Sequence, residues 1–190
     1  VSNQEQKGKF EISKIDFESK AKLENVEFNI LDENKAVIGK LVTDEKGHAE
    51  SGELPLGTYF LKEARAPQGY VSLKEEIKIS ILGDNTGNHL TKNISIGKSE
   101  NASLGDDLIT ISNKAQKMRF VLQKEDFITG NIPQGQNSSL ENATYDVILV
   151  KSHQKGSKLE EGSVVASLKT GKDGRVQSPI LELGIYDVIE

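Results

Sequence analysis

Three polar residues stand where the alternation of a predicted strand calls for an apolar side chain. Successive side chains of a strand point to opposite faces, so every second residue shares a face. Lys14 follows Phe10 and Ile12 on such a face in the segment FEISKID. Glu63 ends the same kind of face in TYFLKE, and Asn113 ends it in LITISN. An amine, a carboxyl group and an amide are therefore candidates for the inside of one apolar core.

Several interpretations fit these residue types. For an isolated lysine, a strand end that reaches solvent is the usual explanation, and a buried lysine–glutamate ion pair is the next. The recurrence favours burial beside a partner, because unpaired burial of a charge costs several kcal/mol. Burial also lowers the pKa of a lysine and leaves a free amine, which is a nucleophile. The same surroundings favour a protonated glutamate, which can donate a hydrogen bond and shuttle a proton.

The elements that must position these residues are short alternating segments separated by turn clusters such as DENK, TDEKG and LGDNTGN. No helical periodicity is sustained, and the spacing of the turns is that of a sandwich or barrel. We therefore predict an all-β fold. The predicted strands are 9–15, 26–31, 36–42, 58–63, 75–81, 92–96 and 108–113.

The sequence contains an internal repeat. The segment LENVEFNIL at 23–31 returns as LENATYDVIL at 140–149, at an offset of 117 residues. Seven further residues return at a constant offset of 127, which indicates two copies of one unit. These are Thr43, Gly47, Leu54, Leu56, Gly57, Tyr59 and Glu63, which match Thr170, Gly174, Leu181, Leu183, Gly184, Tyr186 and Glu190.

The repeat predicts tandem β-sandwich domains at 1–115 and 116–190, the second incomplete on its C-terminal side. Lys124 and Glu190 are the second-domain counterparts of Lys14 and Glu63, and no strand follows Glu190 to supply a counterpart of Asn113. We therefore interpret the sequence as a fragment of a longer protein.

Composition excludes several classes of function. The 190 residues carry a net charge of -5 and no run rich in lysine and arginine, which argues against nucleic acid as a partner. No stretch approaches the length of apolar residues that a membrane helix needs, so we expect no membrane insertion of this segment. The absence of cysteine rules out disulfides and thiolate chemistry.

The order of four motifs resembles a known family. ISKID, TDEKG, LPLGTYFLKEARAPQGY and ITISNK occur in the order typical of the CnaB-type domain of Gram-positive surface proteins and pilins, a prealbumin-like or SpaA-type β-sandwich. The strongest part is APQGY, within the signature YxLxExxAPxGY. The second copy matches through Glu190.

The resemblance implies an intramolecular isopeptide bond from the Lys14 amine to the side-chain carbonyl of Asn113, with Glu63 as the catalytic acid and base. We expect no cofactor and no metal. The resemblance further implies a stalk segment of an extracellular, cell-wall-anchored adhesin or pilin, whose parent protein meets sortase and peptidoglycan. On this interpretation the chain is not an enzyme, because its self-reaction occurs once.

Two alternatives stay open. The loops at 83–107 or 128–140 could bind a host ligand such as a matrix protein, or the second unit could be half of a split ligation pair completed by a strand from another chain. Other sites have weak support. His48, His89 and His153 are isolated among polar residues, and the run GDNTGNH lacks the ligand spacing of a calcium loop.

Overall fold

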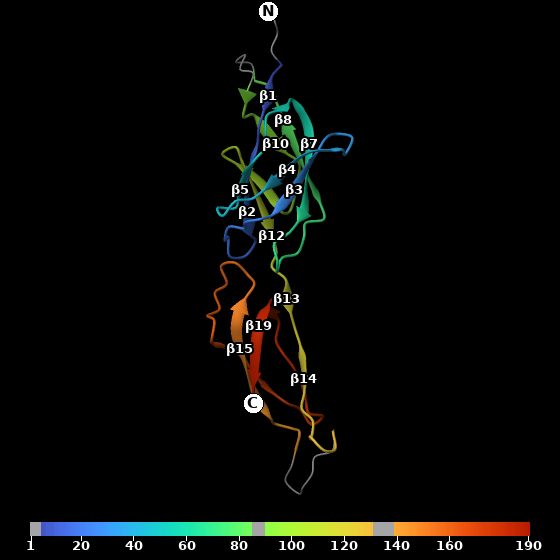
Figure 1. Cartoon of the computed structure of the whole chain (residues 1–190), viewed down its shortest axis with the longest axis vertical. Coiled ribbons are helices and arrows are strands. Elements are labelled where there is room, and N and C mark those ends of the chain that lie inside the picture. The colour runs from blue at the N-terminus through green and yellow to red at the C-terminus, as the bar shows by residue number, and fades with distance from the viewer. Residues whose placement is uncertain (1–4, 85–89, 131–138) are drawn as a thin grey trace, which may run out of the picture. The chain divides into compact units, whose positions relative to one another are not determined.

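The computed structural model describes residues 5–84, 90–130 and 139–190, which are arranged as β-strands and turns without a helix (Figure 1). The predicted all-β fold is confirmed. The chain divides into two compact units, Val1–Lys114 and Ala115–Glu190. Each unit is described by itself below.

Two sheets build the first unit. The larger has strand order β10-β8-β7-β3-β4, and the smaller has order β11-β12-β2-β5. All neighbours in these two sheets are antiparallel except β12 and β2, which are parallel. A short third sheet has order β6-β1-β9. The strands are β1 Lys7–Gly8, β2 Glu11–Asp16, β3 Glu27–Leu31, β4 Val37–Val42, β5 His48–Glu50, β6 Leu54–Pro55, β7 Gly57–Arg65, β8 Glu76–Ile81, β9 Leu90–Thr91, β10 Ile94–Ile96, β11 Ala102–Gly105 and β12 Leu108–Asn113.

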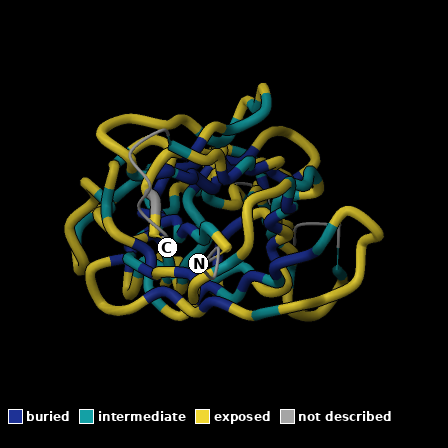
Figure 2. The backbone as a smooth tube through the Cα atoms, turned by 90° about the horizontal axis from the view of Figure 1, so that it is seen from above, coloured by how far each residue is buried: buried dark blue, intermediate teal, exposed yellow. Residues whose placement is uncertain are grey.

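The core of the first unit follows from the alternation of its sequence. Isoleucine, leucine and aromatic side chains from both sheets are buried, while the intervening polar residues and the turns are exposed (Figure 2). All seven predicted segments form strands, namely β2, β3, β4, β7, β8, β10 and β12. The least exposed apolar residues include Phe10, Ile12, Leu23, Val26, Phe28, Leu61, Ile77, Ile79, Ile109 and Ile111.

Sequence analysis missed β5 and β11, which complete the smaller sheet. Neither segment buries a large apolar side chain, since β5 reads HAE and Leu104 of β11 (ASLG) is exposed. The signal that could have revealed β11 is the pair Asp106 and Asp107, whose φ angles are 50° and 63°. Two successive positive φ angles are typical of a two-residue hairpin turn. Here that turn pairs β11 with β12.

The second unit has one three-stranded sheet, of order β16-β15-β19, and two ribbons, β13-β18 and β14-β17. Its buried centre contains Val147, Leu168 and Leu181, against which Phe120 and Tyr186 pack. The strands are β13 Lys117–Met118, β14 Val121–Gln123, β15 Thr144–Ser152, β16 Val164–Lys169, β17 Arg175–Gln177, β18 Leu181–Glu182 and β19 Gly184–Ile189.

A buried threonine makes the same contacts in both copies of the repeat. The Thr43 hydroxyl donates to the carbonyl of Leu23 at 2.8 Å and accepts the amide of Val26 at 3.0 Å. The Thr170 hydroxyl donates to the carbonyl of Leu140 at 2.6 Å and accepts the amide of Ala143 at 3.0 Å. The repeat found in the sequence is thus a repeat of local structure.

A glycine in the left-handed region of φ also recurs, and it touches the lysine strand of each unit. Gly47 has φ of 67°, and its carbonyl accepts the amide of Lys14 at 2.6 Å. Gly174 has φ of 73°, and its carbonyl accepts the amide of Lys124 at 2.9 Å. Lys124 and Lys14 thus make the same backbone contact to a left-handed glycine.

Gly47→Ala should destabilise the first unit, whereas Gly52→Ala should not. A Cβ at position 47 would lie 2.5 Å from the Lys14 carbonyl oxygen, in a backbone conformation that costs a residue with a side chain roughly 1–2 kcal/mol. Gly52 lacks a positive φ, and a Cβ there would meet no atom within 4 Å. Urea denaturation should show a loss of about 2 kcal/mol or more for Gly47→Ala and a change within about 0.5 kcal/mol for Gly52→Ala. Equal stability of the two variants would contradict this account.

Candidate functional site

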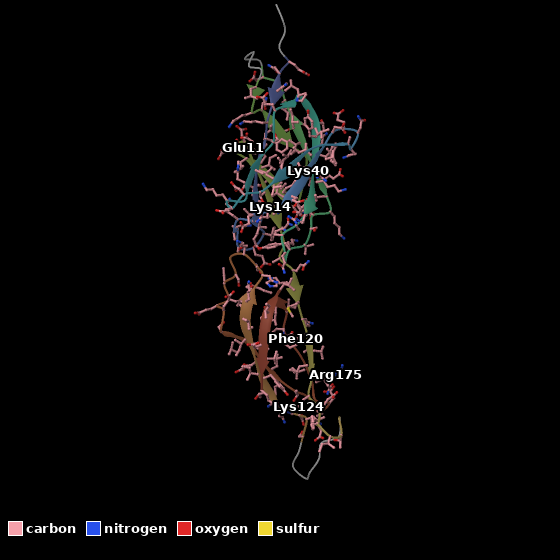
Figure 3. All side chains as sticks on the ribbon, viewed as in Figure 1. Glu11, Lys14, Lys40, Phe120, Lys124 and Arg175 are labelled. Carbon is pink, nitrogen blue, oxygen red and sulfur yellow. The ribbon has the colours of Figure 1, made fainter. Side chains whose placement is uncertain are left out.

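Lys14 lies inside the first unit (Figure 3). It belongs to β2, whose side chains at Ile12, Lys14 and Asp16 alternate with those of Glu11, Ser13 and Ile15. Lys14 is fully buried at 0% exposure, between strands that are themselves rich in isoleucine. The polar end of this side chain must therefore find its partners within the protein.

Asn113 lies on the neighbouring strand and faces the Lys14 amine. Because β2 and β12 are parallel, Lys14 is paired with Ile111, and Asn113 is paired with Asp16. The extended lysine side chain covers this two-residue offset, so its Nζ contacts Asn113 Oδ1 directly. Nζ also lies 3.5 Å from the carbonyl oxygen of Ile111. Asn113 is 0% exposed.

Glu63 reaches the same point from the other sheet, where it lies on β7. Asn113 Nδ2 donates to Glu63 Oε1 at 2.9 Å and to Oε2 at 3.1 Å. Lys14 Nζ is 3.9 Å from Glu63 Oε1, and both of these side chains are 0% exposed. The structure thus brings the three sequence-predicted residues of the first unit into one closed group that joins the two sheets.

The segment that follows the APQGY signature holds this group through its backbone, which sequence analysis did not predict. The Val71 carbonyl accepts Asn113 Nδ2 at 3.1 Å, and the Leu73 amide donates to Glu63 Oε2 at 2.8 Å. The Val71 amide donates to the carbonyl of Lys114 at 2.9 Å. The turn Pro67–Tyr70 precedes this segment and is visible in the sequence. It indicates that the chain reverses there, and in the structure it returns beside the end of β12. Because these contacts are made by main-chain groups, the residue types at 71 and 73 do not predict them.

The electrostatics of the site favour a reactive amine. Burial lowers the pKa of Lys14 to about 8, although the nearby carboxylates of Glu63 and Asp16 act in the opposite direction. At pH 7 a larger share of such side chains is neutral than for an exposed lysine. The arrangement therefore places a partly neutral amine against an amide carbonyl, with a carboxyl group hydrogen-bonded to the amide nitrogen.

The second-unit counterparts also meet, but near solvent. Lys124 Nζ donates to Glu190 Oε1 at 2.5 Å, and their side chains are 27% and 56% exposed. This hydrogen bond raises the pKa of Lys124, opposite in direction to the change at Lys14. Lys124 is labelled in Figure 3 in the second unit. The same two residue types thus form a fully buried group in one unit and a partly exposed ion pair in the other.

The histidines and loops add little to the candidate site. His48 Nε2 lies 3.2 Å from Glu11 Oε2 on the surface of the smaller sheet, and His153 is partly exposed. His89 and most of the run GDNTGNH lie outside the described residues. So do 85–89 of the loop at 83–107 and 131–138 of the loop at 128–140.

The sequence of the first unit matches a known family. Residues 8–98 match SpaA, described as a prealbumin-like fold domain. The match covers just under half of the chain, and we refer to the matched range as the SpaA-type domain. The resemblance expected from the sequence is confirmed. The matched range of the SpaA-type domain contains Lys14 and Glu63, and Asn113 follows it.

Three solved structures are similar to this chain. "The Bacillus anthracis TIE protein" is 27% identical with a TM-score of 0.64, and the match covers 96% of this chain and 28% of that one. A streptococcal ancillary pilin is 22% identical with a TM-score of 0.43, covering 100% of this chain and 54% of that one. BcpA, the major pilin subunit of Bacillus cereus, is 15% identical with a TM-score of 0.41, covering 93% and 54%.

The chain spans between about a quarter and about half of the length of these solved chains. No curated protein matches the sequence. The comparisons therefore show a likeness of residues 8–98 to the SpaA family and a similar fold, and the chemistry is argued from the residues of the first unit.

Lys14 should resist amine-reactive reagents in the folded protein. In an Asn113→Ala variant, where the facing amide is absent, we expect an acetylating pulse to modify Lys35 and Lys124 but not Lys14. The reason is access, since the side chain of Lys14 is 0% exposed and those of Lys35 and Lys124 are 47% and 27% exposed. Peptide mass spectrometry after the pulse provides the measurement, and Lys14 should react once urea unfolds the protein. Modification of Lys14 as fast as Lys35 in the folded state would contradict the closed site.

Proposed function

We propose that the chain is a structural segment of a Gram-positive surface adhesin or pilin, and that its first unit cross-links itself through an isopeptide bond between Lys14 and Asn113. The observation that supports this most directly is the contact of Lys14 Nζ with Asn113 Oδ1 in a fully buried site beside Glu63. The SpaA-type domain and its occurrence among pilin structures support the surface role.

The reaction is the transfer of an acyl group from ammonia to an amine. The neutral Lys14 Nζ attacks the side-chain carbonyl carbon of Asn113, and a new carbon–nitrogen bond forms. The bond from that carbon to Nδ2 then breaks, and Nδ2 leaves as ammonia. One proton passes from Nζ to the departing nitrogen, so the products are a secondary amide and one molecule of ammonia. No oxidant, metal or cofactor takes part in this balance.

Glu63 is the group placed to carry that proton. It is hydrogen-bonded to Nδ2, which must gain a proton, and it lies 3.9 Å from Nζ, which must lose one. Its oxygens accept the amide hydrogens of Nδ2, so one of them can take a proton from the attacking amine and then pass it to the departing nitrogen. The Leu73 amide fixes one of its oxygens at 2.8 Å, which keeps the carboxyl group aimed at Asn113.

Proximity provides the remaining driving force. The folded core holds amine and amide in contact, and effective concentrations for well-oriented intramolecular reactions are far above those reached in solution. Because both reactants are consumed, the reaction occurs once in each molecule. The proposed chain is therefore a self-modifying structural protein and does not turn over a substrate.

The bond would change how the first unit carries load. Lys14 and Asn113 are 99 positions apart and lie on the first and last long strands of the smaller sheet. Tension that enters along β2 would pass through the amide into β12, so the intervening strands would not peel apart. By analogy with a disulfide of similar loop length, the bond would add roughly 4–5 kcal/mol to the free energy of unfolding.

A surface role places the parent protein outside the cell, anchored to the cell wall. Sortase and peptidoglycan would meet the parent protein, and a host matrix protein would be a further partner only if the loops bind it. Within the residues that the structure describes, no helix is long and apolar enough to cross a membrane.

Ligation is a second candidate function, and the exposure of the Lys124–Glu190 pair favours it. Glu190 of this pair lines a groove of about 230 Å³, together with residues that include Tyr145 and Ile189. Moreover, β14 has β17 as its one partner among the described strands, whereas its counterpart β2 is paired on both sides. A strand with an asparagine, supplied by another segment or chain, could pair with β14 and present its amide to Lys124.

The first-unit bond predicts a mass below that of the sequence. The intact protein should weigh about 17 Da less than its residues, the mass of one ammonia, and a proteolytic fragment should join Lys14 to Asn113. Glu63→Ala should restore the full mass because the proton carrier is gone. Glu76→Ala, a change to another strand-borne glutamate that pairs with Lys35, should leave the deficit in place. A wild-type mass equal to that of the sequence would show that the bond does not form.

Ligation predicts capture of a strand peptide. The peptide LITISNK, which copies residues 108–114, should form a covalent adduct with the protein that survives denaturing electrophoresis. The peptide LITISAK should not, because it lacks the acyl donor, and Lys124→Arg should abolish capture. Absence of an adduct at high peptide concentration would restrict the function to the self-cross-linked first unit.

A further inference from the structure

Asp16 is a buried carboxylate that the proposed reaction does not use. It is 0% exposed and follows Lys14 by two residues on β2, so both side chains leave the strand on the same side. In the register of β2 with β12, Asp16 is the residue paired with Asn113. The Lys14 side chain extends toward Asn113 and therefore toward the end of the strand pair where Asp16 lies.

The Asp16 carboxylate caps the turn that closes this end of the site. Its Oδ1 accepts the backbone amides of Glu18 and Ser19, each at 2.7 Å. Within the same turn the Phe17 amide donates to the carbonyl of Asn113 at 2.9 Å. The cap thus fixes the loop whose backbone holds the acyl donor in place. A neutral residue that accepts hydrogen bonds could make the same cap, so the cap does not account for a buried charge.

We propose that Asp16 is a positioning residue whose charge holds Lys14 in the ammonium form and thereby restrains amide formation with Asn113. The inference rests on the proposed cross-linking reaction and assigns a regulator to it. Lys14 must lose a proton before Nζ can bond to the Asn113 carbonyl carbon and ammonia can leave. A fixed negative charge at this end of β2 opposes that loss.

The charges that surround the Lys14 amine are few, which makes the contribution of Asp16 separable. Glu63 faces it from β7 and Asp16 from its own strand, while the facing side chain of β12 is the neutral amide of Asn113. Both carboxylates raise the pKa of Lys14, against the larger opposing effect of burial. Glu63 is needed to move the proton, so only Asp16 can be neutralised without removing that step.

Two substitutions separate the charge of Asp16 from its cap. Asp16→Asn and Asp16→Ser both keep an oxygen that can accept the amides of Glu18 and Ser19, and neither is charged. Serine also lacks an acyl group, so a Lys14 adduct at position 16 cannot be mistaken for the proposed bond. Asp16→Ala removes both charge and cap and serves as the structural comparison.

The experiment follows the loss of 17 Da with time in full-length chains that are collected unreacted in urea and diluted into buffers from about pH 5 to about pH 9. For Asp16→Asn and Asp16→Ser the rate near pH 6 should rise about threefold or more over wild type, and the whole pH profile should move toward acid. Asp16→Ala should fold more slowly because its turn is uncapped. An unchanged or slower reaction with an unshifted profile in the two capped variants would overturn the proposal.

A second measurement does not depend on the reaction. In an Asn113→Ala background, where no bond can form, NMR titration of the Lys14 side chain should show it losing its proton at lower pH when Asp16→Asn or Asp16→Ser is added. The same titration midpoint with and without the charge would again overturn the proposal. If wild type shows no mass loss, the cross-linking function fails; if it does and the profiles coincide, only the assignment of Asp16 fails.

Discussion

Burial of the Lys14 amine is the constraint on which the first unit depends. A charged group in an apolar core costs several kcal/mol unless partners satisfy it, so the surrounding strands must deliver those partners to one point. They do so from two directions: Asn113 arrives on the parallel neighbour β12, and Glu63 arrives from the opposing sheet. The backbone of 71–73 completes the group. The Val71 carbonyl accepts a hydrogen bond from the Asn113 amide, and the Leu73 amide donates one to the Glu63 carboxyl group. The contacts that join the two sheets at this point are consequently also the contacts of the candidate site.

The two units offer a comparison within one chain. They share the buried threonine, the left-handed glycine and the backbone bond from that glycine to the lysine strand. They differ in burial, because Lys14 is enclosed whereas Lys124 lies near solvent. Solvent screens an exposed ion pair and preserves the charge of its lysine, whereas burial works against that charge. The lowered pKa of Lys14 therefore follows from the enclosure of this lysine, and the backbone contacts that the two units share do not by themselves produce it.

Much of the fold was accessible from sequence because its causes are local. Period-two alternation identified the seven segments that became strands, and the constant spacing of threonine, glycine and glutamate identified the repeat. Where the strands are short and bury no large apolar side chain, as in β5 and β11, prediction failed. Those strands exist because β2 and β12 present open edges to them. The assignment of 116–190 as an incomplete domain of the same type stays a prediction.

The sequence by itself determined which side chains of the first unit face inward, since alternation is a property of the strand: Lys14, Glu63 and Asn113 all stand on apolar faces. Only the tertiary structure decided that they meet. Their contact depends on the parallel register of β2 with β12, on the crossing from one sheet to the other, and on main-chain groups at Val71 and Leu73. Asp16 is a second example. The sequence shows that this residue is an aspartate, but its effect on the pKa of Lys14 depends on burial and on the direction in which the lysine extends. Electrostatic energies depend on distance and on exclusion of water, and both are set by packing between residues remote in the chain.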